Sequence, residues 1–444
     1  MTSNDESLRK AFLPAQLALK FHPFYRGKIE IVPKCPIRSF DDFAIWYTPG
    51  VAEPCKAIAA RREAVYENTN KWNTIAIVTD GTRVLGLGDI GPEAGLPVME
   101  GKALLYKYLG GVDAFPICLG TKNTEEIISA VKWIQPSFGG INLEDIAQPK
   151  CFEILDALQG QLDIPVWHDD QQGTATVVLA GFINALKVVG KKISEVKISM
   201  IGAGAANVAL ARLLISSGAK PSNLILVDSK GTLHRNRKDL ERTSPKKWNL
   251  CQTTNSEGLE GGMDVAMKGA DACIALSTPG PGVVTKDMVS SMMDDAIVFA
   301  CANPTPEIWP WEAEEGGAKV VATGRSDFPN QLNNSLGFPG IFRGTIDVRA
   351  KTITDEMCLA ASSELAKLAE EHGLSEKNII PNMDDWEVFP REATAVAEKA
   401  IEQGVARLKR SREELYDSAR SIIKRAREQA KYLMRSGFIQ DFPT

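Results

Sequence analysis

The sequence predicts an α/β protein with two α/β domains on parallel sheets, the second of Rossmann type, followed by C-terminal helices. Short apolar runs alternate with segments of helical length, a pattern typical of a parallel sheet. The turn Gly202–Gly204 stands between an apolar run and a helical segment, as in dinucleotide-binding domains. After Gly344 the pattern becomes helical. The predicted domains are residues 1–172, 173–345 and 346–444.

In the first domain, residues 7–20 have the pattern of an amphipathic helix. Four apolar runs then predict strands, at residues 71–81, 113–120, 139–146 and 164–170. Two segments between them predict helices. The first covers 101–111 and ends in glycine, and the second covers 123–140 and begins at an Asn or Thr cap.

The second domain begins with an apolar helix after Gly173. Residues 196–218 then read as strand, glycine turn and helix, and four more runs predict strands at 223–231, 269–277, 296–304 and 318–324. A helix is expected at 352–373 and a basic helix at roughly 405–435.

The last helix repeats apolar residues every seven positions. The two rows are Leu408, Leu415 and Ile422, and Tyr416, Ile423 and Ala430. This stripe favours packing on the chain's own body or on a second subunit. Its basic charge leaves contact with RNA or a membrane as a less favoured alternative.

The composition limits the classes of partner that the protein is expected to have. The 444 residues carry a net charge of -5, which argues against nucleic acid as the main partner. The longest apolar stretch, residues 175–190, is too short and too interrupted for a membrane span. The eight cysteines form no C-x-x-C pair, which predicts reduced thiols and a cytoplasmic location.

The turn after the strand at 196–201 has the features of a nucleotide site. Gly202 permits a tight turn, and Gly204 allows a pyrophosphate to approach the backbone N–H groups at Ala205 and Ala206. The third position of the fingerprint is Asn207 instead of Gly or Ala, so the match is imperfect.

Asp228 ends the next strand and is placed to accept hydrogen bonds from the ribose of NAD. Ser229, Lys230 and Arg235 follow closely and could hold the 2′-phosphate of NADP, so the choice between NAD and NADP stays open. Ser277 and Thr278 end another strand and are expected at the same edge of the sheet.

Four carboxylates follow two strands of the first domain. These are Glu144 and Asp145 after one strand, and Asp169 and Asp170 after the next. Their convergence without a counterion costs several kcal/mol, about the scale of close like charges at low dielectric. Oxygen ligands favour Mg²⁺ or Mn²⁺ over zinc. Two alternatives remain: acids at a helix start, or solvated loop ends. His168 is expected to be structural.

Several motifs in order resemble the malic enzymes, in particular the short bacterial and archaeal type. They are "WYTPGVAEPC", "VTDGTRVLGLGDIGPEAGLPVMEGKALLY", "INLEDIAQPKCFEIL", "HDDQQGTATV", "GAGAANVA", "ANPTPEI" and "NNSLGFPGIFRG". The resemblance runs from about residue 10 to 405. It implies oxidation and decarboxylation of L-malate to pyruvate and CO₂ with NAD or NADP and with Mg²⁺ or Mn²⁺.

The resemblance also assigns individual residues. It implies that Tyr47 is the general acid, that Lys102 is the general base, and that Asp169 pairs with the lysine. It implies three metal ligands: Glu144, Asp145 and Asp170. It places substrate at Arg83, Asn303 and Asn334, and cofactor also at Thr174 and Asn303. Residue type alone would give most of these side chains ordinary structural roles.

A homodimer or a dimer of dimers is the assembly that the resemblance implies. Whether Tyr47 acts in its own subunit or in a neighbouring one stays open. A malolactic-type or other hydroxy-acid dehydrogenase on the same scaffold is the nearest alternative, and a non-catalytic nucleotide sensor is a more distant one.

Overall fold

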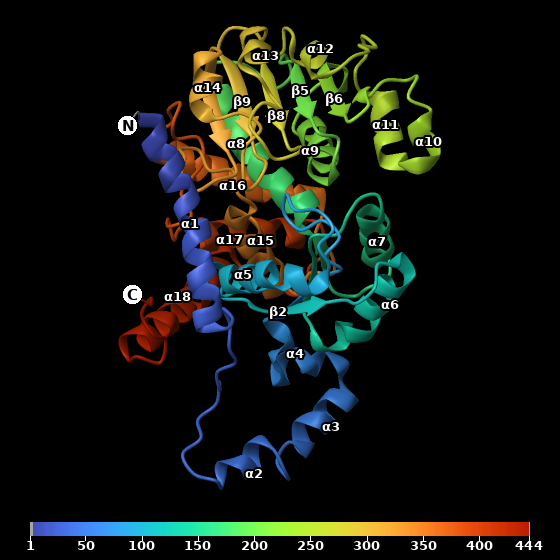
Figure 1. The fold of residues 1–444 in the computed structure, drawn as a ribbon. Coiled ribbons are helices and arrows are strands. Elements are labelled where there is room, and N and C mark those ends of the chain that lie inside the picture. Colours follow the sequence, from blue (N-terminus) through green and yellow to red (C-terminus); the bar gives the residue numbers. More distant parts are fainter. Residues whose placement is uncertain (1–2, 444) are drawn as a thin grey trace.

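The computed structural model describes residues 3–443, with side chains from residue 13 onward. Within this range the strands form a four-stranded sheet, β2-β1-β3-β4, and a six-stranded sheet, β10-β9-β8-β5-β6-β7. Every pairing is parallel except that of β6 with β7. Figure 1 shows the larger sheet at the top and β2 of the smaller sheet below it. The predicted fold class is therefore confirmed.

The part of the chain that leads up to β4, the last strand of the first sheet, begins with a long helix. An arm that carries the short helices α2 and α3 follows it. The helices are α1 (Ser3–Tyr25), α2 (Asp42–Trp46), α3 (Ala52–Ala60), α4 (Val65–Asn68), α5 (Pro92–Gly110), α6 (Thr124–Ile134) and α7 (Lys150–Gln159). The strands are β1 (Thr74–Thr79), β2 (Asp113–Cys118), β3 (Gly140–Leu143) and β4 (Val166–His168). In Figure 1 the arm that carries α2 and α3 extends away from the sheets.

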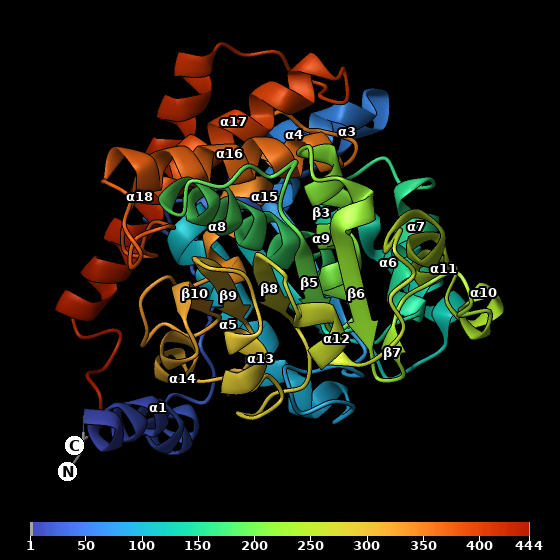
Figure 2. The same ribbon diagram turned by 90° about the horizontal axis from the view of Figure 1, so that it is seen from above.

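The larger sheet is flanked by helices on both faces, which Figure 2 shows from above. Its strands are β5 (Ile198–Ile201), β6 (Leu224–Asp228), β7 (Gly231–Thr232), β8 (Ala272–Ala275), β9 (Ala296–Ala300) and β10 (Ala318–Thr323). On one face lie α8 (Thr174–Val188) and α9 (Ala205–Ser216), and on the other α12 (Met263–Met267), α13 (Lys286–Ser290) and α14 (Pro310–Glu315). Two short helices follow β7: α10 (Asp239–Thr243) and α11 (Pro245–Thr253).

The C-terminal helices pack on both halves of the molecule. They are α15 (Phe338–Asp347), α16 (Asp355–Glu371), α17 (Val388–Glu402) and α18 (Arg412–Arg435). Helix α15 contacts α5 beside the first sheet, while α16 contacts α8 beside the second. The division into residues 1–172, 173–345 and 346–444 stays a proposal.

The core joins these parts through buried aromatic rings. Tyr106 of α5 packs against Phe338 and Phe342 of α15, with ring centroids 4.6 and 5.4 Å apart. Phe182 of α8 meets Phe299 of β9 at 6.2 Å. Burying large rings contributes much of a core's stability, so α15 is held firmly beside the end of α5.

The largest differences between predicted and observed helix starts are at α5 and α18. Helix α5 begins at Pro92, not at residue 101, because Gly95 and Pro97 interrupt its apolar pattern although the structure accommodates both. It ends at Gly111 in a left-handed conformation (φ 64°), as the glycine predicted. Helix α18 begins at Arg412, not near 405, because Ser411 caps it by accepting a hydrogen bond from the N–H of Glu414.

Helix α18 packs on the chain's own body, through the buried side chains of Leu415, Ala419, Ile423 and Ala426. These residues are three or four positions apart, so they form one face of the helix toward α5 and α17. No helix within residues 3–443 combines the length and the apolar character needed to cross a membrane.

We expect Ile423→Ala to lower the free energy of unfolding by about 2–5 kcal/mol, because it opens a cavity under α18. The matched control is Met434→Ala on the same helix, where the side chain is 50% exposed. The midpoint of thermal unfolding should fall clearly for the first variant and stay near wild type for the second. Equal midpoints would contradict the packing of α18.

Candidate functional site

Two neighbouring strands bring acidic residues to one edge of the first sheet. Strands β3 and β4 pair in parallel, and Leu143 lies opposite His168 at their ends. Glu144 and Asp145 follow β3 directly, and Asp169 and Asp170 follow β4. Asp169 begins a single π-helical turn, Asp169–Gly173, that leads into α8 at Thr174. The parallel register therefore brings all four carboxylates together.

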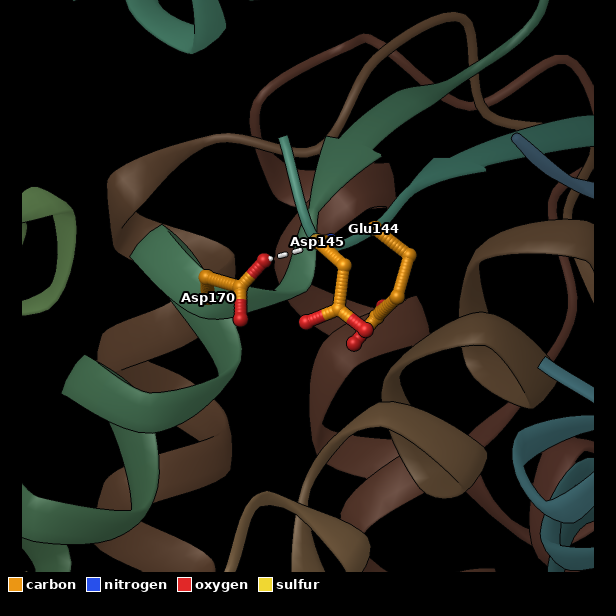
Figure 3. Close-up of side chains that lie close together, drawn as sticks. All are labelled: Glu144, Asp145 and Asp170. Carbon is orange, nitrogen blue, oxygen red and sulfur yellow. Dashed lines mark hydrogen bonds between the residues drawn. The ribbon is translucent and has the colours of Figure 1, made fainter. Parts of the chain in front are cut away.

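Glu144, Asp145 and Asp170 form the tightest group, the carboxylate cluster. One ligand atom from each lies within 4.8 Å of the others, and Figure 3 shows the three side chains converging. Asp145 is in a left-handed conformation (φ 52°), and its N–H donates to Asp170 Oδ2 at 2.9 Å. Glu144 and Asp145 are almost fully buried, whereas the Asp170 side chain is 34% exposed.

The electrostatics of the carboxylate cluster are those of a cation site. Burial, and then the charge of Asp170, raises the pKa of Asp145 to about 8. Asp145 Oδ2 is buried and has no hydrogen-bond partner among the described residues. Burial also raises the pKa of Glu144. The donors are all oxygens, so the residues present fit a hard divalent ion such as Mg²⁺ or Mn²⁺.

Lys102 of α5 reaches the same edge and is 7% exposed. Its Nζ donates to Glu144 Oε1 at 2.6 Å and to Asp169 Oδ2. Burial lowers its pKa, but the charges of Asp169 and Glu144 act more strongly together and raise the pKa overall. Lys102 is therefore a cation here, because its nearest charged neighbours are carboxylates.

Side chains from other elements hold this arrangement. The ring of Phe338 covers the Lys102 ammonium at 4.4 Å. Asn334 Nδ2 donates to Asp169 Oδ2, and Trp167 Nε1 donates to Asp169 Oδ1 at 3.1 Å. Glu144 Oε2 accepts from Asn142 at 2.7 Å. The predicted substrate residue Asn334 thus joins the group, through Asp169.

His168 is fully buried, and its Nδ1 lies 3.7 Å from Asp170 Oδ2. Arg83 lies in the loop after β1, where its N–H donates to the Asp145 carbonyl at 2.9 Å and its side chain is exposed. The same loop brings Gly86 so near the second sheet that a Cβ there would lie 2.5 Å from the Asn303 carbonyl oxygen. The backbone carbonyl of Asn303 therefore lies beside the loop that carries Arg83.

Tyr47 is the predicted residue that the structure leaves outside this group. It follows α2 on the arm that Figure 1 shows extending from the body, and its side chain is 71% exposed. Within one chain, Tyr47 therefore does not join the group in which it would act as the implied general acid.

The glycine turn lies between β5 and α9. Gly202 has a φ of 90°, and a Cβ there would lie 2.6 Å from the Leu276 carbonyl oxygen. A Cβ on Gly204 would meet nothing within 4 Å, so space is open beside the N–H groups of Ala205 and Ala206. Asn207 is buried, and its Nδ2 donates to the carbonyls of Ile201 and Gly202 at 3.0 and 2.8 Å. This side chain stabilises the turn from beneath.

Other predicted cofactor residues end strands of the same sheet. Ser277 and Thr278 follow β8, and Asp228 ends β6 next to β5. Ser229 and Lys230 are exposed beyond it. Glu307, which sequence reasoning missed, is fully buried and accepts from the N–H groups of Ser277 and Ala302 at 2.8 and 3.0 Å. The sequence signal that could have identified Glu307 is an acidic residue directly after "NPTP" in an apolar context.

Comparisons with known proteins find malic enzymes similar to this chain. The family model described as "Malic enzyme, NAD binding domain" matches residues 171–401, and "Malic enzyme, N-terminal domain" matches 26–127 and 120–159. The Bacillus subtilis "Bifunctional malic/malolactic enzyme" is 48% identical, covering 91% of this chain and 97% of that protein. The Geobacillus stearothermophilus "NAD-dependent malic enzyme" is 51% identical, covering 86% and 78%.

A crystal structure of Entamoeba histolytica malic enzyme is similar across the whole molecule. The TM-score is 0.97 at 49% sequence identity, and the match covers 100% of this chain and 93% of that one. Relatives also include an "NADP-dependent malic enzyme" from Halomonas elongata, 42% identical over 88% of this chain and 94% of that protein.

The carboxylate cluster predicts opposite effects of one substitution with and without metal. Mn²⁺ at about 100 times its Kd should add about 2.7 kcal/mol to the free energy of unfolding of the wild type. Asp145→Asn should lose most of this gain. In chelator the same variant should be at least as stable as wild type, because burial and the charge of Asp170, which raise the pKa of Asp145 to about 8, make this carboxyl costly to bury.

Thermal unfolding with Mn²⁺ and with chelator measures both effects, and isothermal titration measures the affinity. Asp163→Asn, at a side chain that is 74% exposed, is the matched control and should behave as wild type. Undiminished stabilisation of Asp145→Asn by Mn²⁺ would remove Asp145 from the metal site.

Proposed function

The chain belongs to the malic enzyme family, and on that premise we propose that it oxidises and decarboxylates L-malate to pyruvate and CO₂ while reducing NAD or NADP. We further propose that Glu144, Asp145 and Asp170 hold Mg²⁺ or Mn²⁺. The observation that carries the proposal is Lys102, a buried cation between Glu144 and Asp169 at the edge that also presents the carboxylate cluster.

The substrate supplies charges that suit this edge. Malate is a dicarboxylate with a hydroxyl on C2, and we assign one of its carboxylates to Arg83, whose exposed guanidinium can donate two parallel hydrogen bonds. Asn303 and Asn334 supply amide groups on the facing side. A bound divalent ion would offset the carboxylate charges, favour neutral Lys102 and polarise the oxygen on C2.

Lys102 then removes the proton from the C2 hydroxyl, and Asp169 orients the amine through the hydrogen bond that it already accepts. A bound nicotinamide cofactor would supply the acceptor for the hydride that leaves C2. The carboxylate on C4 leaves as CO₂, its bonding electrons remain on the product enolate, and the Tyr47 hydroxyl donates a proton to C3. Pyruvate, CO₂ and reduced cofactor balance malate and oxidised cofactor, because the proton that Lys102 takes from the hydroxyl is matched by the one that Tyr47 gives to C3.

Two substitutions separate the two proton transfers. Lys102→Ala should abolish malate oxidation, with kcat reduced by about 10²-fold or more, the usual worth of a general base. Tyr47→Phe should retain reduction of oxaloacetate and lose protonation of the pyruvate enolate. Steady-state kinetics with malate, and proton exchange at C3 of pyruvate, measure the two steps. Normal malate turnover by both variants would overturn the assignment.

The relative named bifunctional malic/malolactic enzyme makes a malolactic reaction the second candidate. The same malate assay distinguishes the two, because malolactic chemistry yields lactate without net reduced cofactor. We expect one reduced cofactor for each CO₂ released. Lactate formed in place of pyruvate would favour the second candidate.

We propose that the arm reaches a second copy of the chain and that Tyr47 completes the partner's site. Large apolar side chains of the arm are exposed, as in Ile31 (82%), Phe40 (89%) and Trp46 (45%). Several large apolar side chains exposed on one segment are typical of a subunit interface. A homodimer buries it and explains why Tyr47 lies away from Lys102. A cytoplasmic location is also proposed, since all eight cysteines are unpaired.

Complementation tests this arrangement. If Tyr47 acts across the interface, a random mixture of Tyr47→Phe and Lys102→Ala subunits should regain about a quarter of wild-type activity, because half the dimers contain one intact site. Each variant alone is inactive toward malate and serves as the control. No recovery in mixtures shown to contain heterodimers would place Tyr47 in its own subunit's site.

A further inference from the structure

Asp228, the acid at the end of β6, is held by an arginine that the pattern of residues 228–235 did not single out. Arg237 Nη1 donates to Asp228 Oδ1 at 3.0 Å, and Arg237 Nη2 donates to Asp228 Oδ2 at 2.9 Å. The N–H of Lys230 also donates to Oδ1, at 2.9 Å. The Asp228 carboxylate is thus fixed in orientation at the strand end where a dinucleotide's ribose lies.

The same guanidinium is bound on its other edge. Nε donates to Asp239 Oδ1 at 2.9 Å, and Nη2 donates to Asp239 Oδ2 at 3.2 Å. The remaining N–H of Nη1 donates to the Thr232 carbonyl at 3.3 Å. A guanidinium has five N–H donors, and all five are used here. The Arg237 side chain is 10% exposed.

These contacts bear on whether the site favours the ribose of NAD or the 2′-phosphorylated ribose of NADP. We propose that the Arg237–Asp239 pair makes this enzyme select NAD over NADP, by keeping Asp228 ionised toward the ribose hydroxyls and leaving no guanidinium donor for a 2′-phosphate. The proposal rests on the proposed function and names its cofactor. A 2′-phosphate would approach the Asp228 carboxylate and meet like charge, whereas a hydroxyl can donate to it.

The other cations near Asp228 are less able to act as a phosphate site. Lys230 Nζ lies 3.3 Å from Asp239 Oδ2, and Arg235 is exposed. Lys247 is half-buried, and its charge interacts with that of Asp228. A lysine is a single point charge, whereas the paired donors of a guanidinium match phosphate geometry. Release of Arg237 from Asp239 is therefore the change that should admit NADP.

The test is malate oxidation by the full-length enzyme with Mn²⁺, with NAD and NADP in parallel. The wild type should have kcat/KM at least about tenfold higher with NAD, the scale of one charge-assisted hydrogen bond. Asp239→Ala frees two donors of Arg237 and should raise kcat/KM with NADP about tenfold, so that the ratio of the NAD value to the NADP value falls. Glu241→Ala, an exposed acid on the same helix, is the matched control and should change neither.

Further variants keep the test decisive. Asp228→Ala should reverse the preference, and Lys247→Ala should leave the ratio of the two kcat/KM values unchanged. A wild type that uses NADP as well as NAD, or an Asp239→Ala variant with an unchanged ratio, overturns the proposal. If neither cofactor is reduced, the proposed function fails instead, and fluorescence titration with NADH and NADPH still measures the predicted selectivity.

Discussion

The parallel register of β3 and β4 is the constraint on which the site depends. It gathers Glu144, Asp145, Asp169 and Asp170 at one buried edge, where the carboxylates repel one another unless positive charge is added. Lys102 supplies one such charge from α5, and the raised pKa of Asp145 marks where more is needed. The same carboxylates that hold Lys102 as a cation would, once neutralised, let it act as a base.

The surrounding fold supports this electrostatic arrangement. Tyr106 packs on α15, which places Phe338 over the Lys102 ammonium and Asn334 beside Asp169. The C-terminal helices therefore build part of a site whose carboxylates follow strands of the first sheet and whose lysine comes from α5. At the second sheet, ion pairs orient Asp228 and the buried Glu307 ties two strand ends together. In both places, the partners of a carboxylate fix its orientation, so that it can face a bound ligand in one defined direction.

The strands, the glycine turn and the convergence of acids were predictable, because each depends on local pattern and on the common edge of neighbouring parallel strands. The imperfect fingerprint at Asn207 is explained by its hydrogen bonds beneath the turn. The features of the site that the sequence did not predict depend on contacts between segments that are distant in the sequence. Phe338 reaches Lys102 across more than 200 positions, and Arg237 instead of Arg235 faces Asp228 because the chain turns after β7. In the proposed dimer, the role of Tyr47 depends on the surface of a second subunit, which the pattern of one sequence does not reveal.

A crystal structure with Mn²⁺ and malate, with data collected at the manganese absorption edge, tests most directly whether this edge binds a divalent ion. We expect one anomalous peak bounded by oxygens of Glu144, Asp145 and Asp170, with the substrate's oxygens beside it and the contact between Lys102 and Glu144 released. An absence of anomalous density there at saturating Mn²⁺, with Lys102 still bound to Glu144, would contradict the proposal that this edge uses a divalent ion for its chemistry.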